Sequence, residues 1–140
     1  MILNQVKNPK KLILGSSSPR RLELLLQLRI KPDLIKSPDI NEATKKLELP
    51  RDYCIRMAKE KANAIDVEYD DVLLTADTIV CVGRRILGKP SNEDQVREFL
   101  KILSGRRHKV ITSVAVKYQD KLLERCVIST VKMKNISNNP

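Results

Sequence analysis

The stretch KLILGSSSPRRLELLLQL, residues 11–28, predicts a strand that leads directly into a helix. Its first four residues read as a short buried strand, and the small residues after them form a turn. Ser18 suits the N-cap of the helix and Pro19 suits its first position. Leucines at helical spacing then continue the pattern, at Leu22, Leu25 and Leu26. A strand–turn–helix junction of this kind often binds phosphate in α/β proteins.

Arg20 and Arg21 are unexpected in the first turn of that helix. The amides of a first turn lack partners and the helix dipole adds positive charge, so acidic residues are usual there. A phosphate would turn this penalty into binding, because amides, dipole and guanidinium groups would all attract it. The alternative is that both arginines simply point into solvent.

Composition limits the class of protein. The chain has 140 residues, enough for a hydrophobic core, and residues 1–140 are expected to form a single domain. Its net charge of +10 permits nucleic acid, an anionic membrane or a phosphorylated small molecule as a partner. Nucleic acid is disfavoured, because Trp is absent, Phe occurs once and the basic residues are scattered.

Three widely spaced cysteines and a single histidine predict neither a disulfide framework nor a zinc site. They favour a reducing compartment, so we expect a cytoplasmic protein. The apolar run at residues 11–14 is too short for a signal peptide, and no later run is long enough to span a membrane.

The rest of the chain alternates helices and strands, which predicts an α/β fold. Residues 31–50, with three prolines, read as an extended connection, and residues 51–66 as a helix. Residues 71–87 contain two strands with a turn at Gly83. Residues 91–105 read as a helix that Ser91 caps and Gly105 stops. The segments 110–118 and 122–133 form an antiparallel pair.

Lys61 shares a face of the predicted 51–66 helix with Cys54, Ala58 and Ile65. A lysine on such an apolar face is seldom buried without an anion. Either its ammonium group contacts an anion, or its alkyl stem lies along the apolar surface and the ammonium group reaches water.

Asp77 interrupts a nearly continuous apolar run and is either a turn former or a site residue. Lys89 follows the next strand, between Gly88 and Pro90, at a bend that would present its ammonium group. Glu42 adds a second carboxylate that could hold a hard cation with Asp77. Cations near a phosphate-binding helix, with two carboxylates, fit metal-assisted chemistry on a polyphosphate.

Five ordered motifs then resemble the Maf family of nucleoside triphosphate pyrophosphatases, over about residues 11–134: SSSPRRLELL, AKEKA, TADTIV, LGKP and LSGRRHKVIT. The resemblance implies an α/β fold, an elongated mixed β-sheet with flanking helices around a nucleotide-binding cleft, similar to that of ITPase-like proteins. It also implies hydrolysis of a nucleoside triphosphate to the monophosphate and pyrophosphate, with Mg²⁺ or Mn²⁺. Domains of this family often pair, so a homodimer is one expectation.

The resemblance also assigns roles to residues. Glu42 and Asp77 would bind the metal, and Asp77 would accept a proton. Arg20 and Thr78 match positions that distinguish branches of the family, and here they resemble the branch acting on dTTP and UTP. His108 matches a motif too, although a lone histidine beside a strand is more often structural. The residues expected to bind the triphosphate are Ser16, Arg20, Arg21, Lys61 and Lys89.

The sequence departs from the family pattern in places. Gly15 replaces the commoner alanine, and Asn41 stands where an aspartate often precedes Glu42. Family members continue beyond the last strand with a segment that carries a base-contacting glutamine, so we expect a domain incomplete at its C-terminus. Three hypotheses follow: an active pyrophosphatase, an inactive nucleotide-binding remnant, or a basic nucleic-acid-binding module.

Overall fold

The computed structural model describes residues 10–135, which form three helices and six strands. In chain order these are β1 (Leu12–Leu14), α1 (Pro19–Gln27), β2 (Leu34–Ile35), α2 (Pro50–Ala64), β3 (Val72–Val82), β4 (Arg85–Leu87), α3 (Glu93–Leu103), β5 (Arg107–Tyr118) and β6 (Lys121–Lys132).

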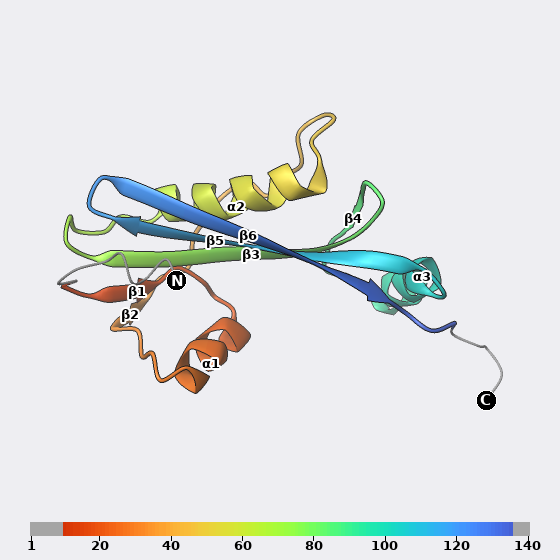
Figure 1. Ribbon diagram of the computed structural model, residues 1–140, viewed down its shortest axis with the longest axis horizontal. Coiled ribbons are helices and arrows are strands. Elements are labelled where there is room, and N and C mark those ends of the chain that lie inside the picture. Colours follow the sequence, from red (N-terminus) through yellow and green to blue (C-terminus); the bar gives the residue numbers. More distant parts are fainter. Residues whose placement is uncertain (1–9, 136–140) are drawn as a thin grey trace.

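The strands form one mixed sheet in the order β2-β1-β3-β5-β6, with β4 paired to β3 (Figure 1). β1 runs parallel to both β2 and β3, whereas the pairs β3–β4, β3–β5 and β5–β6 are antiparallel. The long strands β5 and β6 give the molecule its elongated shape (Figure 1). The expected mixed α/β sheet with flanking helices is confirmed.

One edge of β3 is divided between two partners. β1 pairs with residues 72–74 of β3, and β4 pairs with residues 80–82. Residues 75–79, which include Asp77 and Thr78, therefore have no strand partner along this edge among the described strands. Of the two alternatives for Asp77, the turn former is wrong, because β3 continues through this residue.

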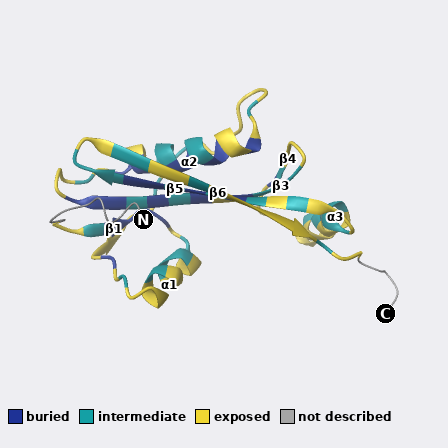
Figure 2. Ribbon diagram, viewed as in Figure 1, coloured by how far each residue is buried: buried dark blue, intermediate teal, exposed yellow. Residues whose placement is uncertain are grey.

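The hydrophobic core lies between α2 and the sheet (Figure 2). Small side chains let the helix approach closely, since Cys54, Ala58 and Ala62 are all 0% exposed. They pack against residues of β1, β3 and β5, among them Ile13, Leu73, Ile79, Ile111 and Ala115. α1 lies on the opposite side of the sheet from α2 (Figure 1).

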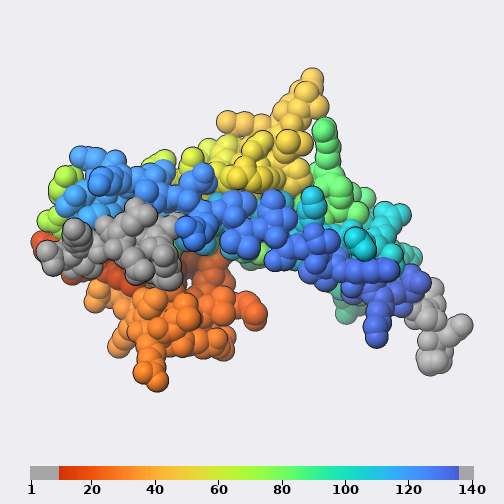
Figure 3. Space-filling model, viewed as in Figure 1, coloured from red at the N-terminus to blue at the C-terminus, as the bar shows by residue number. Residues whose placement is uncertain are grey.

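The other two helices bury little. No residue of α1 or α3 is buried by the described part of the chain. Leu26 in the expected stripe of α1 is 48% exposed, and Val96 and Leu100 in α3 are 41% and 38% exposed. Figure 3 shows α1 (orange) projecting from the body of the molecule, and α3 (cyan) near the end of the molecule where β6 ends.

Most predicted boundaries hold within two residues, but one cap is wrong. Asn92, not Ser91, caps α3, since its Oδ1 accepts a hydrogen bond from the Gln95 amide at 2.9 Å. Ser91 instead donates through its hydroxyl to Gln95 Oε1 at 2.8 Å. The segment expected to be an extended connection also contains the two-residue strand β2. None of the helices in residues 10–135 has the length and apolarity needed to cross a bilayer.

Candidate active site

The turn between β1 and α1 is tied together by its own side chains. Ser16 Oγ accepts hydrogen bonds from the Ser18 amide at 3.0 Å and from Arg21 Nη1 at 3.4 Å. Ser18 is the N-cap, as predicted, and its hydroxyl accepts from the Arg21 amide at 3.4 Å. The Arg21 guanidinium is therefore held against the turn, while Arg20 is exposed. The two arginines are not equivalent.

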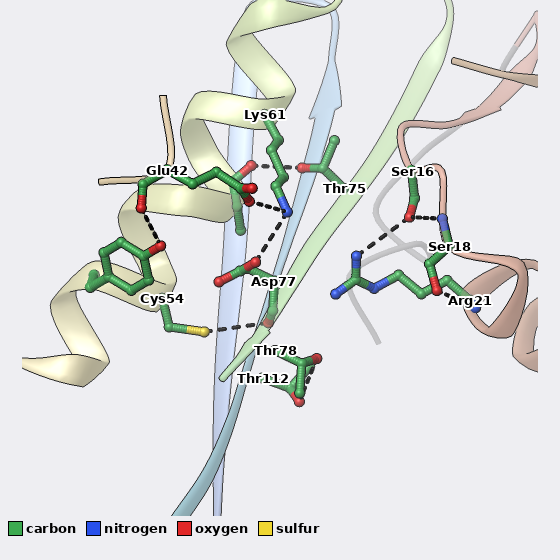
Figure 4. Close-up of polar contacts among 12 residues, drawn as sticks. Ser16, Ser18, Arg21, Glu42, Cys54, Lys61, Thr75, Asp77, Thr78 and Thr112 are labelled. Carbon is green, nitrogen blue, oxygen red and sulfur yellow. Dashed lines mark hydrogen bonds and ion pairs between the residues drawn. The ribbon is translucent and has the colours of Figure 1, made fainter. Parts of the chain in front are cut away.

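Lys61 lies between two carboxylates. Its Nζ is 3.0 Å from Asp77 Oδ1 and 3.4 Å from Glu42 Oε1 (Figure 4). The side chains of Lys61 and Asp77 are each 12% exposed, whereas that of Glu42 is 60% exposed. The alternative in which the ammonium group of Lys61 reaches water is therefore wrong. Figure 4 shows Arg21 extending toward Asp77 from the α1 side.

Burial sets the electrostatics of Asp77. Its pKa is raised, chiefly because the carboxyl group loses hydration, and the positive charges of Lys61 and Arg21 partly oppose this rise. The sulfur of the neighbouring Cys54 lies 3.3 Å from the Asp77 carbonyl oxygen and 3.4 Å from that of Ile111, and its single S–H donates to one of the two or is shared between them. Burial raises the pKa of Cys54 to about 12, so this thiol is a neutral packing group.

Three adjoining hollows open beside the free edge of β3, and Arg21 and Lys89 line all three. The polar hollow, about 380 Å³, is lined by Gly15, Ser16, Ser17, Ser18, Pro19, Arg21, Pro38, Asp39, Ile40, Glu42, Lys61 and Lys89. The apolar hollow, about 550 Å³, lies between α1 and the sheet and includes Arg20, Leu24, Leu25, Leu28, Thr78, Thr112 and Val114. The central hollow, about 580 Å³, includes Glu42, Tyr53, Lys61, Asp77 and Thr78.

The structure brings most of the predicted site residues to this cleft. Those lining the polar hollow are Ser16, Arg21, Glu42, Lys61 and Lys89, and Asp77 and Thr78 line the central one. Arg20 lines only the apolar hollow, which it shares with Arg21. His108 lines none of these three hollows, and its Nδ1 is buried without a hydrogen-bond partner among residues 10–135.

Two residues at the site escaped the sequence analysis. Thr112 on β5 lies opposite Thr78 on β3, with the two hydroxyl oxygens 3.2 Å apart. Tyr53 donates through its hydroxyl to the Glu42 carbonyl oxygen at 2.6 Å. Both contacts join segments distant in sequence. Thr78 and Thr112 are 34 positions apart, and Tyr53 reaches a loop 11 positions before it, so neither contact leaves a local pattern in the sequence.

The carboxylates fit a divalent cation in part. Glu42 and Asp77 flank the same ammonium group, so they converge on a point that favours positive charge. Within residues 10–135 there is no cluster of three metal-binding side chains. Mg²⁺ commonly takes one or two protein carboxylates and completes its shell with phosphate oxygens and water, and this pair suits that mode.

Residues 11–140 match the family model described as Maf-like protein. This match, together with a mixed sheet that holds basic side chains and carboxylates in one cleft, defines the class: the chain belongs to the Maf-like family.

Similar sequences carry a more specific name. A protein of Roseobacter denitrificans called dTTP/UTP pyrophosphatase is 58% identical over 125 residues, which cover 89% of this chain and 66% of that protein. A dTTP/UTP pyrophosphatase of Ruegeria sp. is 56% identical over 126 residues, covering 90% of this chain and 65% of that protein. The chain thus spans slightly under two thirds of the length of these curated relatives.

Solved structures agree on the fold. A HAM1 protein from Coxiella burnetii superposes with a TM-score of 0.57 over 86% of this chain and 71% of that one, at 14% identity. A nucleoside-triphosphatase, or dITP/XTP pyrophosphatase, from Mycobacterium abscessus gives a TM-score of 0.51 at 14% identity, over 90% of this chain and 75% of that one. At such identities the likeness concerns the architecture alone.

Proposed function

We propose that this chain carries the catalytic cleft of a nucleoside triphosphate pyrophosphatase that converts dTTP or UTP to the monophosphate and pyrophosphate. One observation carries the proposal: Arg21, Lys61 and Lys89 line the same cleft as Glu42 and Asp77. Three cations suit a triphosphate, and two carboxylates suit a metal and an attacking water. The relatives named dTTP/UTP pyrophosphatase support the substrate.

The triphosphate would lie in the polar hollow. Ser16 holds Arg21 Nη1 at 3.4 Å, which directs the guanidinium across the start of α1. The Ser18 and Arg21 amides already donate to the hydroxyls of Ser16 and Ser18, so the Arg20 amide and the Arg21 guanidinium would meet the phosphate oxygens. Lys61 and Lys89 would neutralise the remaining charge from the other walls of the hollow.

Asp77 is the proposed proton acceptor. Water would attack the α-phosphorus while the bond to the bridging α–β oxygen breaks, so that pyrophosphate leaves and the water proton passes to the Asp77 carboxylate. Burial raises the pKa of Asp77, which makes its ionised form a stronger base. The Lys61 ammonium at 3.0 Å keeps that form populated.

Glu42 and Asp77 would hold Mg²⁺ or Mn²⁺ beside the phosphates. When bound, such an ion neutralises charge that builds up on the phosphate oxygens during the reaction. Two carboxylates alone bind it weakly, so the triphosphate is expected to bring the metal with it.

The nucleoside would occupy the apolar hollow. Its leucines and Val114 offer surface for a base and sugar, while Arg20, Thr78 and Thr112 supply polar contacts. We further propose a cytoplasmic location, because the three cysteines are all free thiols. A homodimer is part of the same proposal.

Pyrophosphate release from dTTP, UTP, CTP and GTP, with Mg²⁺ or Mn²⁺, tests the function. The variants are Asp77→Asn and, as the matched control, Asp66→Asn, an exposed residue just after α2. Turnover of UTP and dTTP that only Asp77→Asn abolishes supports the proposal. UTP binding without turnover by the folded protein would instead support the nucleotide-binding remnant. Salt-dependent binding of RNA or DNA that Asp77→Asn and Arg21→Gln leave unchanged would support the nucleic-acid module.

A further inference from the structure

Glu42 lies on a long loop between β2 and α2, a segment of residues 36–49 that contains no helix or strand. The Glu42 side chain is 60% exposed, so packing of that side chain does little to fix it. A loop of this length is costly to order unless contacts elsewhere hold its backbone. The Glu42 carboxylate nevertheless lies 3.4 Å from Lys61 Nζ.

The first contact that holds this loop comes from Tyr53 on α2. Its hydroxyl donates to the Glu42 carbonyl oxygen at 2.6 Å, while its ring is part of the core beneath. Tyr53 is only 8% exposed, so its position is set by packing and not by the loop. A rigid donor therefore fixes the backbone of Glu42 itself.

The second contact is a network around Arg56, one turn further along α2. Arg56 donates through Nε and Nη2 to the two carboxylate oxygens of Glu48, at 2.7 and 2.8 Å. Nη2 also donates to the Ala43 carbonyl oxygen at 3.0 Å, and Nη1 to Glu60 Oε2 at 3.0 Å. The guanidinium lies over the Tyr53 ring, 5.6 Å from its centre.

The loop is organised around these contacts. Glu48 Oε1 also accepts from the Lys45 amide at 3.1 Å, and the Glu48 amide donates to the Lys45 carbonyl oxygen at 3.1 Å. The Ala43 amide donates to Asn41 Oδ1 at 3.0 Å. Arg56 thus binds both ends of a short folded stretch, residues 43–48. The side chains of Arg56 and Glu48 are 18% and 10% exposed, so the pair is largely shielded from water.

We propose that Tyr53 and Arg56 are positioning residues: they clamp the 42–48 stretch to α2 and thereby hold the Glu42 carboxylate beside Lys61 and Asp77. The value of this arrangement rests on the proposed function, since Glu42 would be a metal ligand. The clamp itself is a property of the loop and can be tested without turnover. A bidentate guanidinium is required, because an ammonium group cannot reach Glu48 and Ala43 together.

Amide hydrogen exchange of the 140-residue chain, followed by NMR, tests the clamp at the amides of Ala43, Lys45 and Glu48. Tyr53→Phe removes a single hydroxyl. Arg56→Lys keeps the charge but loses the paired N–H donors that bind both oxygens of Glu48. Both should speed exchange at these amides by roughly two- to tenfold, the factor for losing one hydrogen bond. Exchange in the α2 and β3 core should stay unchanged. The matched controls are Tyr69→Phe and Arg97→Lys, both on exposed side chains.

Binding of Mn²⁺ alone, measured from the EPR signal of the free ion, gives the second readout. Tyr53→Phe should weaken it by roughly two- to tenfold, since the ligand loop must then be ordered on binding. Unchanged exchange of the loop amides in Tyr53→Phe would overturn the clamp, whatever Arg56→Lys does to folding. If the unaltered chain binds no Mn²⁺ either alone or with UTP present, the metal part of the proposed function fails, while the exchange result still decides the clamp.

Discussion

Lys61 Nζ and Asp77 Oδ1 lie 3.0 Å apart, and both side chains are 12% exposed. Two opposite charges shielded to this degree depend on each other, because either one left alone in a poorly hydrated site is costly. Lys61 is on α2 and Asp77 is on β3, and both line the central hollow, so a change to either residue of the site should also change the stability of the fold. The same ammonium also faces Glu42 at 3.4 Å.

Lys61→Met should destabilise the chain by about 2–4 kcal/mol, because it leaves the Asp77 carboxylate without its main partner. The double variant Lys61→Met/Asp77→Asn should recover part of this loss, since the unpaired charge is then gone. Urea unfolding of the two single variants and the double variant gives the coupling energy.

The Arg85–Glu98 pair is the matched control for that cycle. Its N–O distance is similar, 3.2 Å, but its side chains are 58% and 57% exposed. Arg85→Met should therefore cost less than about 1 kcal/mol. Equal losses for Lys61→Met and Arg85→Met, with an additive double variant, would contradict a coupled pair.

Gly15→Ala should destabilise the chain, although alanine is the commoner residue of the family motif. A Cβ at Gly15 would lie 2.6 Å from Ile65 Cδ1 and 2.7 Å from Thr75 Cγ2. Thr75 cannot move easily, because its hydroxyl donates to the Ala58 carbonyl oxygen at 2.7 Å. Overpacking of this kind costs roughly 1–3 kcal/mol.

Thermal or urea unfolding measures that loss, and Ile65→Val in the same background should reduce it by removing the nearest methyl group. Ile65→Val alone should cost about 1 kcal/mol, the usual effect of deleting one buried methylene. A Gly15→Ala variant as stable as the unaltered chain would show that the β1–α1 turn shifts freely, which the tight Ser16–Ser18–Arg21 contacts argue against.

The three helices, the strands other than β2 and the start of α1 were predictable because they depend on local patterns. Alternation, helical spacing and capping residues are read within a few positions, and even the wrong cap of α3 is displaced by only one residue, from Ser91 to Asn92. The exposure of α3 was not predictable, because an apolar stripe such as Val96–Leu100 shows which face is apolar without showing what packs on it.

The site was predictable by residue type more than by arrangement. Lys61 and Asp77 were expected near phosphate, but their direct pairing requires α2 to cross β3 where one edge is open. Arg20 and Arg21 were expected to act together. Successive helical residues point about 100° apart, so only the Arg21 guanidinium reaches Ser16, although both arginines line the apolar hollow.

Acid should weaken the clamp through Glu48. Its hydrogen bonds with Arg56 lower the pKa of the Glu48 carboxyl from 4.5 to about 2. A lowered pKa means that the folded chain holds this proton less tightly than the unfolded chain, so Glu48 stabilises the fold above about pH 4.5. This contribution is lost as the pH falls from about 4.5 toward 2.

Urea unfolding between pH 7 and pH 2 checks this, with Glu48→Gln beside the unaltered chain. The stability difference between them should be largest at neutral pH and should shrink across the window in which Glu48 becomes protonated. Glu23→Gln, on the exposed face of α1, is the matched control. A difference that stays constant with pH would mean that the charge of Glu48 contributes nothing to the fold.

Arg21 and Arg20 should differ in what they bind. Arg21 lines all three hollows, whereas Arg20 lines the apolar one. Arg21→Gln should weaken binding of inorganic tripolyphosphate by about tenfold or more, the effect of losing charge-assisted hydrogen bonds. Arg20→Gln should weaken it by less than about threefold, as expected for a charge that remains exposed.

Calorimetric titration with tripolyphosphate and with UTP separates these roles. Arg20→Gln should affect UTP more than tripolyphosphate, because only UTP has a nucleoside to place in the apolar hollow. Arg125→Gln, on the exposed face of β6, lowers the net charge equally and should affect neither ligand. If all three variants weaken tripolyphosphate by the same factor, overall charge and not the start of α1 attracts the anion. The two arginines of the SPRR motif would then owe their presence to something other than phosphate.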